Sequence, residues 1–189
     1  MDEIKEQWME GLAAKEQAGR ARAAAEIYRV GCARADSAVA GWWQNRELAE
    51  LRAGHGAATV GLAVSPARFA RIREANGFPP LAAVPPEQDA SEFPLYFPNG
   101  IALDVLTTRE PGAGGAIARF LARQGEGLQQ VEFRCGDVDR ATAILRKQFG
   151  IEPVYPAKRP GADGSAVNFF LVAGAEGKKV LIELYETTD

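Results

Sequence analysis

Four segments of the chain alternate apolar and polar side chains with the period of two that is typical of β-strands. They read TVGLAV at 59–64, IALDVL at 101–106, QVEFRC at 130–135 and VLIELY at 180–185. The first segment is like the third, and the second is like the fourth, so the same strand unit occurs twice. We expect such a duplicated unit to fold about a pseudo-twofold axis, with its two copies forming one cleft.

The residues around these segments complete two modules, at 57–108 and 127–188. Each module is predicted to contain a strand, a helix and three further strands, which is a β-α-β-β-β order. The first module's predicted elements are strand 57–64, a helix that Ser65 caps and Pro66 opens, and strands near 81–84, 92–97 and 101–107. The second module's are strand 128–135, helix 138–149 between Asp137 and Gly150, and strands near 152–155, 166–172 and 179–186. The predicted fold class is α+β.

Residues 1–55 are predicted to form a separate N-terminal helical extension, and residues 56–189 the strand-rich domain. The stretch 2–30 is rich in strong helix formers, and 36–52 has the pattern of a second helix. These two helices predict a hairpin that either covers the strand-rich domain or joins the subunits of a homodimer.

Composition and charge exclude several classes of function. The 189 residues are 47% apolar and 25% charged, which is ordinary for a globular protein. The formal net charge is −3 and no basic stripe occurs, so no nucleic-acid partner is expected. No run of about 18 apolar residues predicts a membrane span, and the charged start MDEIKEQW favours a cytoplasmic protein. Cys32 and Cys135 have no metal or redox spacing, and the single histidine, His55, is expected in a solvated loop.

Alternation also assigns polar side chains to one face of the predicted sheets. Gln130, Glu132 and Arg134 lie opposite the apolar residues of their strand, as Asp104 and Glu183 do in theirs. Charged side chains cannot form a second core, so this polar face is predicted to be a ligand site. An exposed face on which Arg134 neutralises the acids is the alternative.

The second module carries three longer motifs. They read IARFLARQGEGLQQVEFRCGDVDRA at 117–141, RPGADGSAVNFF at 159–170 and KKVLIELYE at 178–186. Together they resemble the vicinal oxygen chelate (glyoxalase/bleomycin-resistance) superfamily, and are most similar to methylmalonyl-CoA epimerases. The resemblance covers roughly residues 57–187 and implies a glyoxalase-like fold.

The resemblance also implies a metal site. Members of the superfamily hold a divalent metal with two histidines, a Gln or Glu, and a Glu. The matching positions in this chain are Thr59, Asp104, Gln130 and Glu183, so both histidines are replaced. We therefore expect either no cofactor or a weakly bound divalent cation, and the oxygen donors would suit Mg²⁺, Ca²⁺ or Mn²⁺.

The same resemblance implies catalytic roles for two carboxylates. The stretch VPPEQDASE at 84–92 is similar to a family segment whose final glutamate acts as a base, and this position is Glu92. Epimerisation at a carbon between a carboxylate and a thioester needs a base and an acid, so Glu92 and Glu183 are the predicted catalytic pair. The predicted substrate-binding residues are Arg134, Asn168 and Glu132.

Three functions fit these observations. The first is an isomerase, or a related enzyme, that acts on a small carboxylate or an acyl-CoA thioester. The second is a metal-free protein of the same fold that binds a small molecule without catalysis, as antibiotic-sequestering members do. The third is a structural or regulatory relative whose helical hairpin fills the cleft with Trp42 and Trp43. We expect these tryptophans instead to pack the hairpin onto the strand-rich domain.

Overall fold

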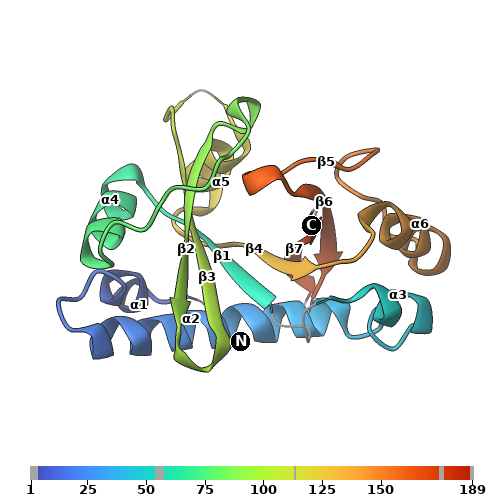
Figure 1. Ribbon diagram of the computed structural model, residues 1–189, viewed down its shortest axis with the longest axis horizontal. Coiled ribbons are helices and arrows are strands. Elements are labelled where there is room, and N and C mark those ends of the chain that lie inside the picture. Colours follow the sequence, from blue (N-terminus) through green and yellow to red (C-terminus); the bar gives the residue numbers. More distant parts are fainter. Residues whose placement is uncertain (1–3, 54–57, 113, 175–176, 188–189) are drawn as a thin grey trace. The chain divides into compact units, whose positions relative to one another are not determined.

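The computed structural model describes residues 4–53, 58–112, 114–174 and 177–187. His55 lies outside the described residues. The chain forms two compact units, drawn in Figure 1: unit 1 is Met1–Gly31 with Thr59–Gln129, and unit 2 is Cys32–Ala58 with Gln130–Asp189. None of the helices in the described part of the chain has the length and apolar character that crossing a membrane requires.

Residues 4–53, the described part of the N-terminal region, contain three helices instead of the predicted pair. They are α1 (Glu6–Gly11), α2 (Gln17–Val39) and α3 (Arg46–Leu51). Asn45 caps the start of α3, because its side chain accepts a hydrogen bond from the Leu48 amide at 3.1 Å. The sequence predicted that one helix ends at residue 30 and the next begins at residue 36. This break is wrong, because α2 is continuous through residues 31–35 (Figure 1). The boundary at residue 55 between extension and domain stays a prediction.

Gly31 explains why a glycine is found inside α2. A Cβ atom at this position would lie 2.6 Å from the side chain of Val60 in strand β1 (Ala58–Ala63). A glycine inside a helix costs about 1 kcal/mol relative to alanine, and the close approach to the strand requires it here. The residue therefore marks a packing contact and does not end the helix.

Unit 1 contains a three-stranded sheet covered by α4 (Pro66–Ala75). β1 pairs in parallel with β3 (Ile101–Thr108), and β3 pairs antiparallel with β2 (Ala90–Phe97). As predicted, Ser65 caps α4 and Pro66 opens it, and a further helix, α5 (Ala116–Gln124), follows the sheet. The core lies between α4 and one face of the sheet, where the rings of Phe69 and Phe93 are 4.7 Å apart.

The strand predicted near 81–84 does not form. Prolines at 79, 80, 85 and 86 surround this stretch, and proline cannot donate to a strand ladder. One backbone hydrogen bond, from the Ala82 amide to the Glu92 carbonyl at 3.0 Å, still holds the stretch beside β2. The first module therefore has a β-α-β-β order.

Unit 2 contains a four-stranded sheet with the order β4-β7-β6-β5. Its elements are β4 (Gly127–Arg134), α6 (Val138–Phe149), β5 (Arg159–Pro160), β6 (Ala166–Ala173) and β7 (Lys179–Glu186). β4 and β7 are parallel, whereas β6 is antiparallel to both β7 and β5. The strand predicted near 152–155 is reduced to a single bridge between Pro153 and Phe170, but the β-α-β-β-β order is present because β5 forms instead.

The two tryptophans pack on the apolar face of this sheet. Trp42 meets the ring of Phe170 at 5.9 Å, and Trp43 meets the ring of Phe133 at 5.5 Å. Phe133 alternates with Glu132 along β4, so these contacts lie on the face opposite the predicted site. The packing expectation is confirmed, and entry of the tryptophans into the site is contradicted.

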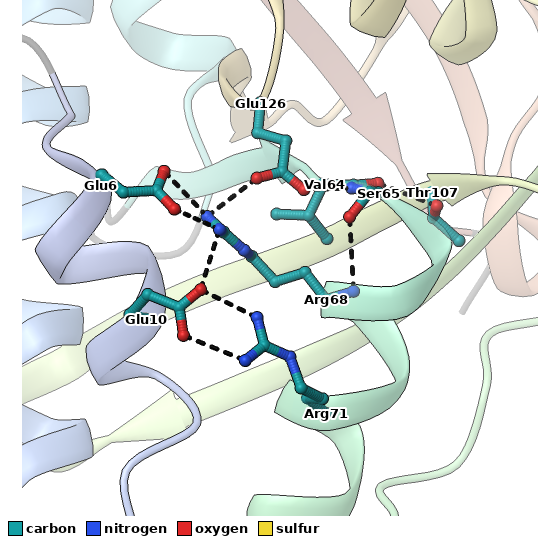
Figure 2. Close-up of polar contacts among 8 residues, drawn as sticks. All are labelled: Glu6, Glu10, Val64, Ser65, Arg68, Arg71, Thr107 and Glu126. Atoms are coloured by element: carbon teal, nitrogen blue, oxygen red, sulfur yellow. Dashed lines mark hydrogen bonds and ion pairs between the residues drawn. The ribbon is translucent and has the colours of Figure 1, made fainter.

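A network of ion pairs anchors α1 within unit 1 (Figure 2). The Arg68 side chain, only 9% exposed, pairs with Glu6, with Glu10 at 2.9 Å and with Glu126 at 2.8 Å. Arg71 adds a second contact to Glu10 at 2.8 Å. The guanidinium of Arg68 therefore joins α1, α4 and the segment before β4 through three carboxylates.

Candidate functional site

The polar face of unit 2 brings two carboxylates together on neighbouring strands. Glu132 on β4 is the register partner of Glu183 on β7, so their side chains project side by side from the same face. Gln130 lies two residues before Glu132 and shares this face. Gln130, Glu132 and Glu183 are 6%, 9% and 9% exposed, so the group is buried although it is wholly polar.

The side-chain amide of Gln130 holds the two carboxylates. Its Nε2 donates to Glu132 Oε1 at 3.0 Å and to Glu183 Oε2 at 2.6 Å. Ionised carboxylate oxygens only accept hydrogen bonds, so this arrangement requires the nitrogen of the amide, and not its oxygen, to face both acids. Gln130 therefore fixes the position of Glu183 on the face predicted to bind a ligand.

Arg134 extends the same face of β4 toward its end. Its Nη2 donates to the hydroxyl of Thr187 at 2.7 Å, and its backbone carbonyl accepts from the Ala53 amide at 3.1 Å. The side chain is half-buried. A planar guanidinium held in this way presents N–H groups suited to a ligand carboxylate.

Asn168 lies on the opposite face of the sheet from Gln130, Glu132 and Glu183, as the strand register shows. It pairs with Leu184, whereas its neighbour Phe169 pairs with Glu183, so Asn168 lies on the apolar face of β6. The side chain is fully buried, and its Nδ2 donates to the Tyr155 carbonyl at 3.2 Å. The structure thus does not bring Asn168 beside Glu183, as the predicted substrate contact requires.

In unit 1, the register places the three predicted site residues on one face. Asp104 is the partner of Gly61, which lies two residues after Thr59 on β1. Glu92 is the partner of Leu106, which lies two residues after Asp104 on β3. Glu92 and Asp104 are therefore diagonal neighbours across β2 and β3, about 7–8 Å apart between backbones. All three side chains are half-buried.

The donors of unit 2 do not fit the divalent metal that the resemblance implies. An N–H group cannot ligate a cation, and Gln130 directs its Nε2 at Glu183. Within the described residues, no group of three or more His, Cys, Asp or Glu side chains is arranged to hold a metal ion. The reaction proposed for this chain therefore relies on its own side chains, and the metal roles of Thr59 and Asp104 stay predictions.

Purified protein is expected to hold substoichiometric zinc and cobalt. Thr59 and Gln130 occupy the positions at which the resemblance places imidazoles, and neither side chain binds these metals strongly. Elemental analysis of protein prepared without chelator checks this expectation. Stoichiometric zinc or cobalt that survives gel filtration would contradict it.

Cys135 is not a nucleophile of this site. Burial raises the pKa of its thiol, and the sulfur lies 3.3 Å from the carbonyl of Asp137. Reactive cysteines need a lowered pKa and access to solvent. The thiol is therefore a buried structural group that follows the end of β4.

Three residues of the polar face of unit 2 were not assigned by sequence. Phe169 is the partner of Glu183, Tyr155 packs on Phe169 at 6.1 Å, and Arg159 lies over the Tyr155 ring at 4.5 Å. Alternation along 166–172 could have identified Phe169, but it predicts neither the register with β7 nor the contact with Tyr155. Arg159 was visible only as the first residue of the RPG motif.

Comparison of the chain with models of protein families finds no match, and comparison with curated proteins finds none either. Solved structures do match. Methylmalonyl-CoA epimerase from Mycobacterium tuberculosis is 30% identical, with a TM-score of 0.56 over 69% of this chain and 87% of that chain. A Streptomyces coelicolor methylmalonyl-CoA epimerase variant in complex with 2-nitronate-propionyl-CoA is 25% identical, with a TM-score of 0.54 over 69% and 96%. A hypothetical protein from Bacillus halodurans, 21% identical with a TM-score of 0.56 over 69% and 93%, shares the fold.

These similarities confirm the α+β, glyoxalase-like fold predicted from the sequence. The chain belongs to the vicinal oxygen chelate superfamily, and within it the chain is similar to methylmalonyl-CoA epimerases.

Proposed function

We propose that the chain is an isomerase, or a closely related enzyme, that acts on a small carboxylate or an acyl-CoA thioester. Epimerisation of methylmalonyl-CoA is the reaction to test first. Similarity to methylmalonyl-CoA epimerases supports this proposal, as does the presence of a glutamate at 183. The observation that carries it is the buried hydrogen bond from Gln130 to Glu183, which fixes one carboxylate on the polar face.

The proposed chemistry is a proton exchange at one carbon. The substrate carbon lies between a carboxylate and a thioester carbonyl, so loss of its proton leaves an electron pair that delocalises into the thioester oxygen. One carboxylate, Glu92 or Glu183, accepts the proton as the C–H bond breaks. The other, protonated at the start, returns a proton to the opposite side, and the two acids exchange roles after each turnover.

Two further residues have supporting roles in this proposal. Gln130 positions Glu183 by donating to its carboxylate. Arg134 binds the substrate carboxylate, because its guanidinium lies on the same face and is held by Thr187.

Incorporation of solvent deuterium tests the proposal. Methylmalonyl-CoA in D₂O should gain deuterium at its α carbon when the protein is added, measured by mass spectrometry. The reaction is run alone and with Mg²⁺, Mn²⁺ or Co²⁺, so a requirement for a weakly bound cation is detected. No incorporation under any of these conditions would end the proposal.

A second candidate is a small-molecule-binding protein of the same fold that has no catalytic activity. One observation favours it: the Gln130 amide donates hydrogen bonds to both Glu132 and Glu183. These carboxylates therefore have a hydrogen-bond partner within the protein, as they would in a purely structural polar group. Binding of an acyl-CoA thioester without any deuterium incorporation would identify this function.

A further inference from the structure

A second buried carboxylate, Glu132, lies beside Glu183 in unit 2. The two glutamates are register partners on the parallel strands β4 and β7, so they project from the same face, and each is 9% exposed. Like charges directly opposite each other destabilise a sheet, and a buried acid is tolerated only when it is hydrogen-bonded. Packing alone therefore does not explain why β4 has a glutamate at this position.

The Gln130 amide is the group that the two glutamates share. Its Nε2 carries two hydrogens and donates to Glu132 Oε1 at 3.0 Å and to Glu183 Oε2 at 2.6 Å. One hydrogen is therefore available for each carboxylate. Gln130 is only 6% exposed, so solvent competes little for either hydrogen bond.

The orientation of the Gln130 amide depends on Glu132 as well as on Glu183. A primary amide has two nearly isosteric orientations, which exchange the places of its nitrogen and its oxygen. With the nitrogen toward the acids, both contacts are hydrogen bonds, whereas with the oxygen toward them both contacts are repulsive. Each hydrogen bond to a charged group favours the first orientation by about 10- to 100-fold. Glu132 therefore strengthens the selection that Glu183 alone would provide.

The strand holds Glu132 firmly in place. Val131 and Phe133, its neighbours on β4, point to the opposite face and are 0% and 2% exposed. Phe133 also meets the ring of Trp43 at 5.5 Å. A side chain on a strand, between two residues of the core, is a more precise support than one on a loop. Glu132 can therefore hold the Gln130 amide in one orientation before and after a ligand binds.

We propose that Glu132 is a positioning residue. By accepting a hydrogen bond from Nε2, it holds the Gln130 amide with its nitrogen toward Glu183 and so fixes the direction of the Glu183 carboxylate. This inference rests on the proposed function and adds a residue to it. In this role Glu132 acts through Gln130 and is not a proton carrier.

Side-chain NMR of the Gln130 amide tests these hydrogen bonds directly. In protein that contains isotope-labelled glutamine, the Gln130 signals are assigned by their absence in Gln130→Met. Glu132→Met removes the acceptor oxygen at nearly unchanged volume, so the amide hydrogens should exchange with solvent at least about 10-fold faster than in the wild type. Glu132→Gln retains an acceptor oxygen and should return the exchange rate to within about threefold of the wild type.

Kinetics separate this role from the substrate contact that the sequence predicted for Glu132. A misplaced acid or base slows the chemical step, so Glu132→Met should lower kcat for deuterium incorporation about 10- to 100-fold. KM, and the affinity for the unreactive thioester propionyl-CoA, should stay within about threefold of the wild type. Loss of a substrate contact would instead raise KM with kcat unchanged.

The matched control is Glu47→Met. Glu47 is an exposed residue of α3 that accepts a hydrogen bond from Gln148 Nε2 at 2.6 Å, so the same pair of groups is broken at the surface. This variant should change neither the Gln130 signals nor kcat. If circular dichroism shows that Glu132→Met does not fold, Glu132→Ala removes the same acceptor and replaces it in both measurements.

Unchanged exchange of the Gln130 amide in Glu132→Met would overturn the inference, and so would a raised KM with unchanged kcat. Glu132→Gln that is as impaired as Glu132→Met would also overturn it, because the charge and not the acceptor oxygen would then be needed. The proposed reaction fails separately: a wild type without deuterium incorporation ends the reaction, and the amide signals still decide whether Glu132 positions Gln130.

Discussion

Replacement of Glu183 by glutamine is expected to reduce deuterium incorporation into methylmalonyl-CoA by roughly 10²–10⁴-fold, the usual contribution of a positioned acid or base. An amide cannot accept or return the proton. Its oxygen can still accept the hydrogen bond from Gln130 Nε2, which spans 2.6 Å in the wild type. The variant should therefore fold normally and bind propionyl-CoA, while exchange is lost.

Glu92→Gln should give the same loss of exchange with binding retained, because the proposed reaction needs both carboxylates. Glu152→Gln is the matched control, since Glu152 is an exposed acid of unit 2 that pairs with Arg146 at the surface. It should leave exchange unchanged. If Glu183→Gln retains exchange within about twofold of the wild type, Glu183 is not a proton carrier and the catalytic proposal is wrong.

Local periodicity predicted a large part of the candidate site. Alternation along β4 placed Gln130, Glu132 and Arg134 on one face, and the buried hydrogen bonds from Gln130 agree with that placement. The pattern is local because successive side chains of a strand point to opposite faces whatever the partner strand is. Glu183 could be placed by the same reasoning.

Strand register could not be predicted in this way. Asn168 interrupts the apolar face of β6 with a polar side chain, and its role becomes clear only from its partner Leu184 and its hydrogen bond to Tyr155. Likewise, the glycine inside α2 is explained only by the packing of Gly31 against Val60, which lies far along the chain. Both features are set by tertiary contacts, which override local propensity.

The ion-pair network of Arg68 is the clearest example of a tertiary contact that local sequence patterns cannot predict. Arg68 lies 62 residues from Glu6 and 58 from Glu10, and no local pattern connects them. The guanidinium is nevertheless buried and has carboxylates on several sides (Figure 2). Such a group is tolerated in a protein interior only when it is paired and hydrogen-bonded.

Arg68→Met is therefore expected to lower the free energy of unfolding by about 2 kcal/mol at pH 7, the usual value for losing hydrogen bonds to a charged group. The loss is smaller than for a fully buried pair, because Glu6 and Glu10 are 66% and 42% exposed and regain water when the guanidinium is removed. Urea unfolding followed by circular dichroism measures the change.

The pH dependence of this loss provides a second, independent readout. A hydrogen bond from Arg68 lowers the pKa of Glu6 below its ordinary 4.5, and one from Arg71 does the same for the pKa of Glu10. A carboxyl group whose pKa is lower in the folded chain stabilises it above pH 4.5, and this stabilisation is lost as the pH falls through the folded pKa. The difference between wild type and Arg68→Met should therefore be largest near neutral pH and should shrink in acid.

Arg123→Met is the matched control for this prediction, since it makes the same chemical change at an exposed arginine of α5. It should alter the unfolding free energy by less than about 0.5 kcal/mol at any pH, as surface substitutions usually do. A pH-independent loss in Arg68→Met would mean that the methylene stem, and not the charge, provides the stability. A loss no greater than that of the control would show that α1 is held in place without the ion pairs.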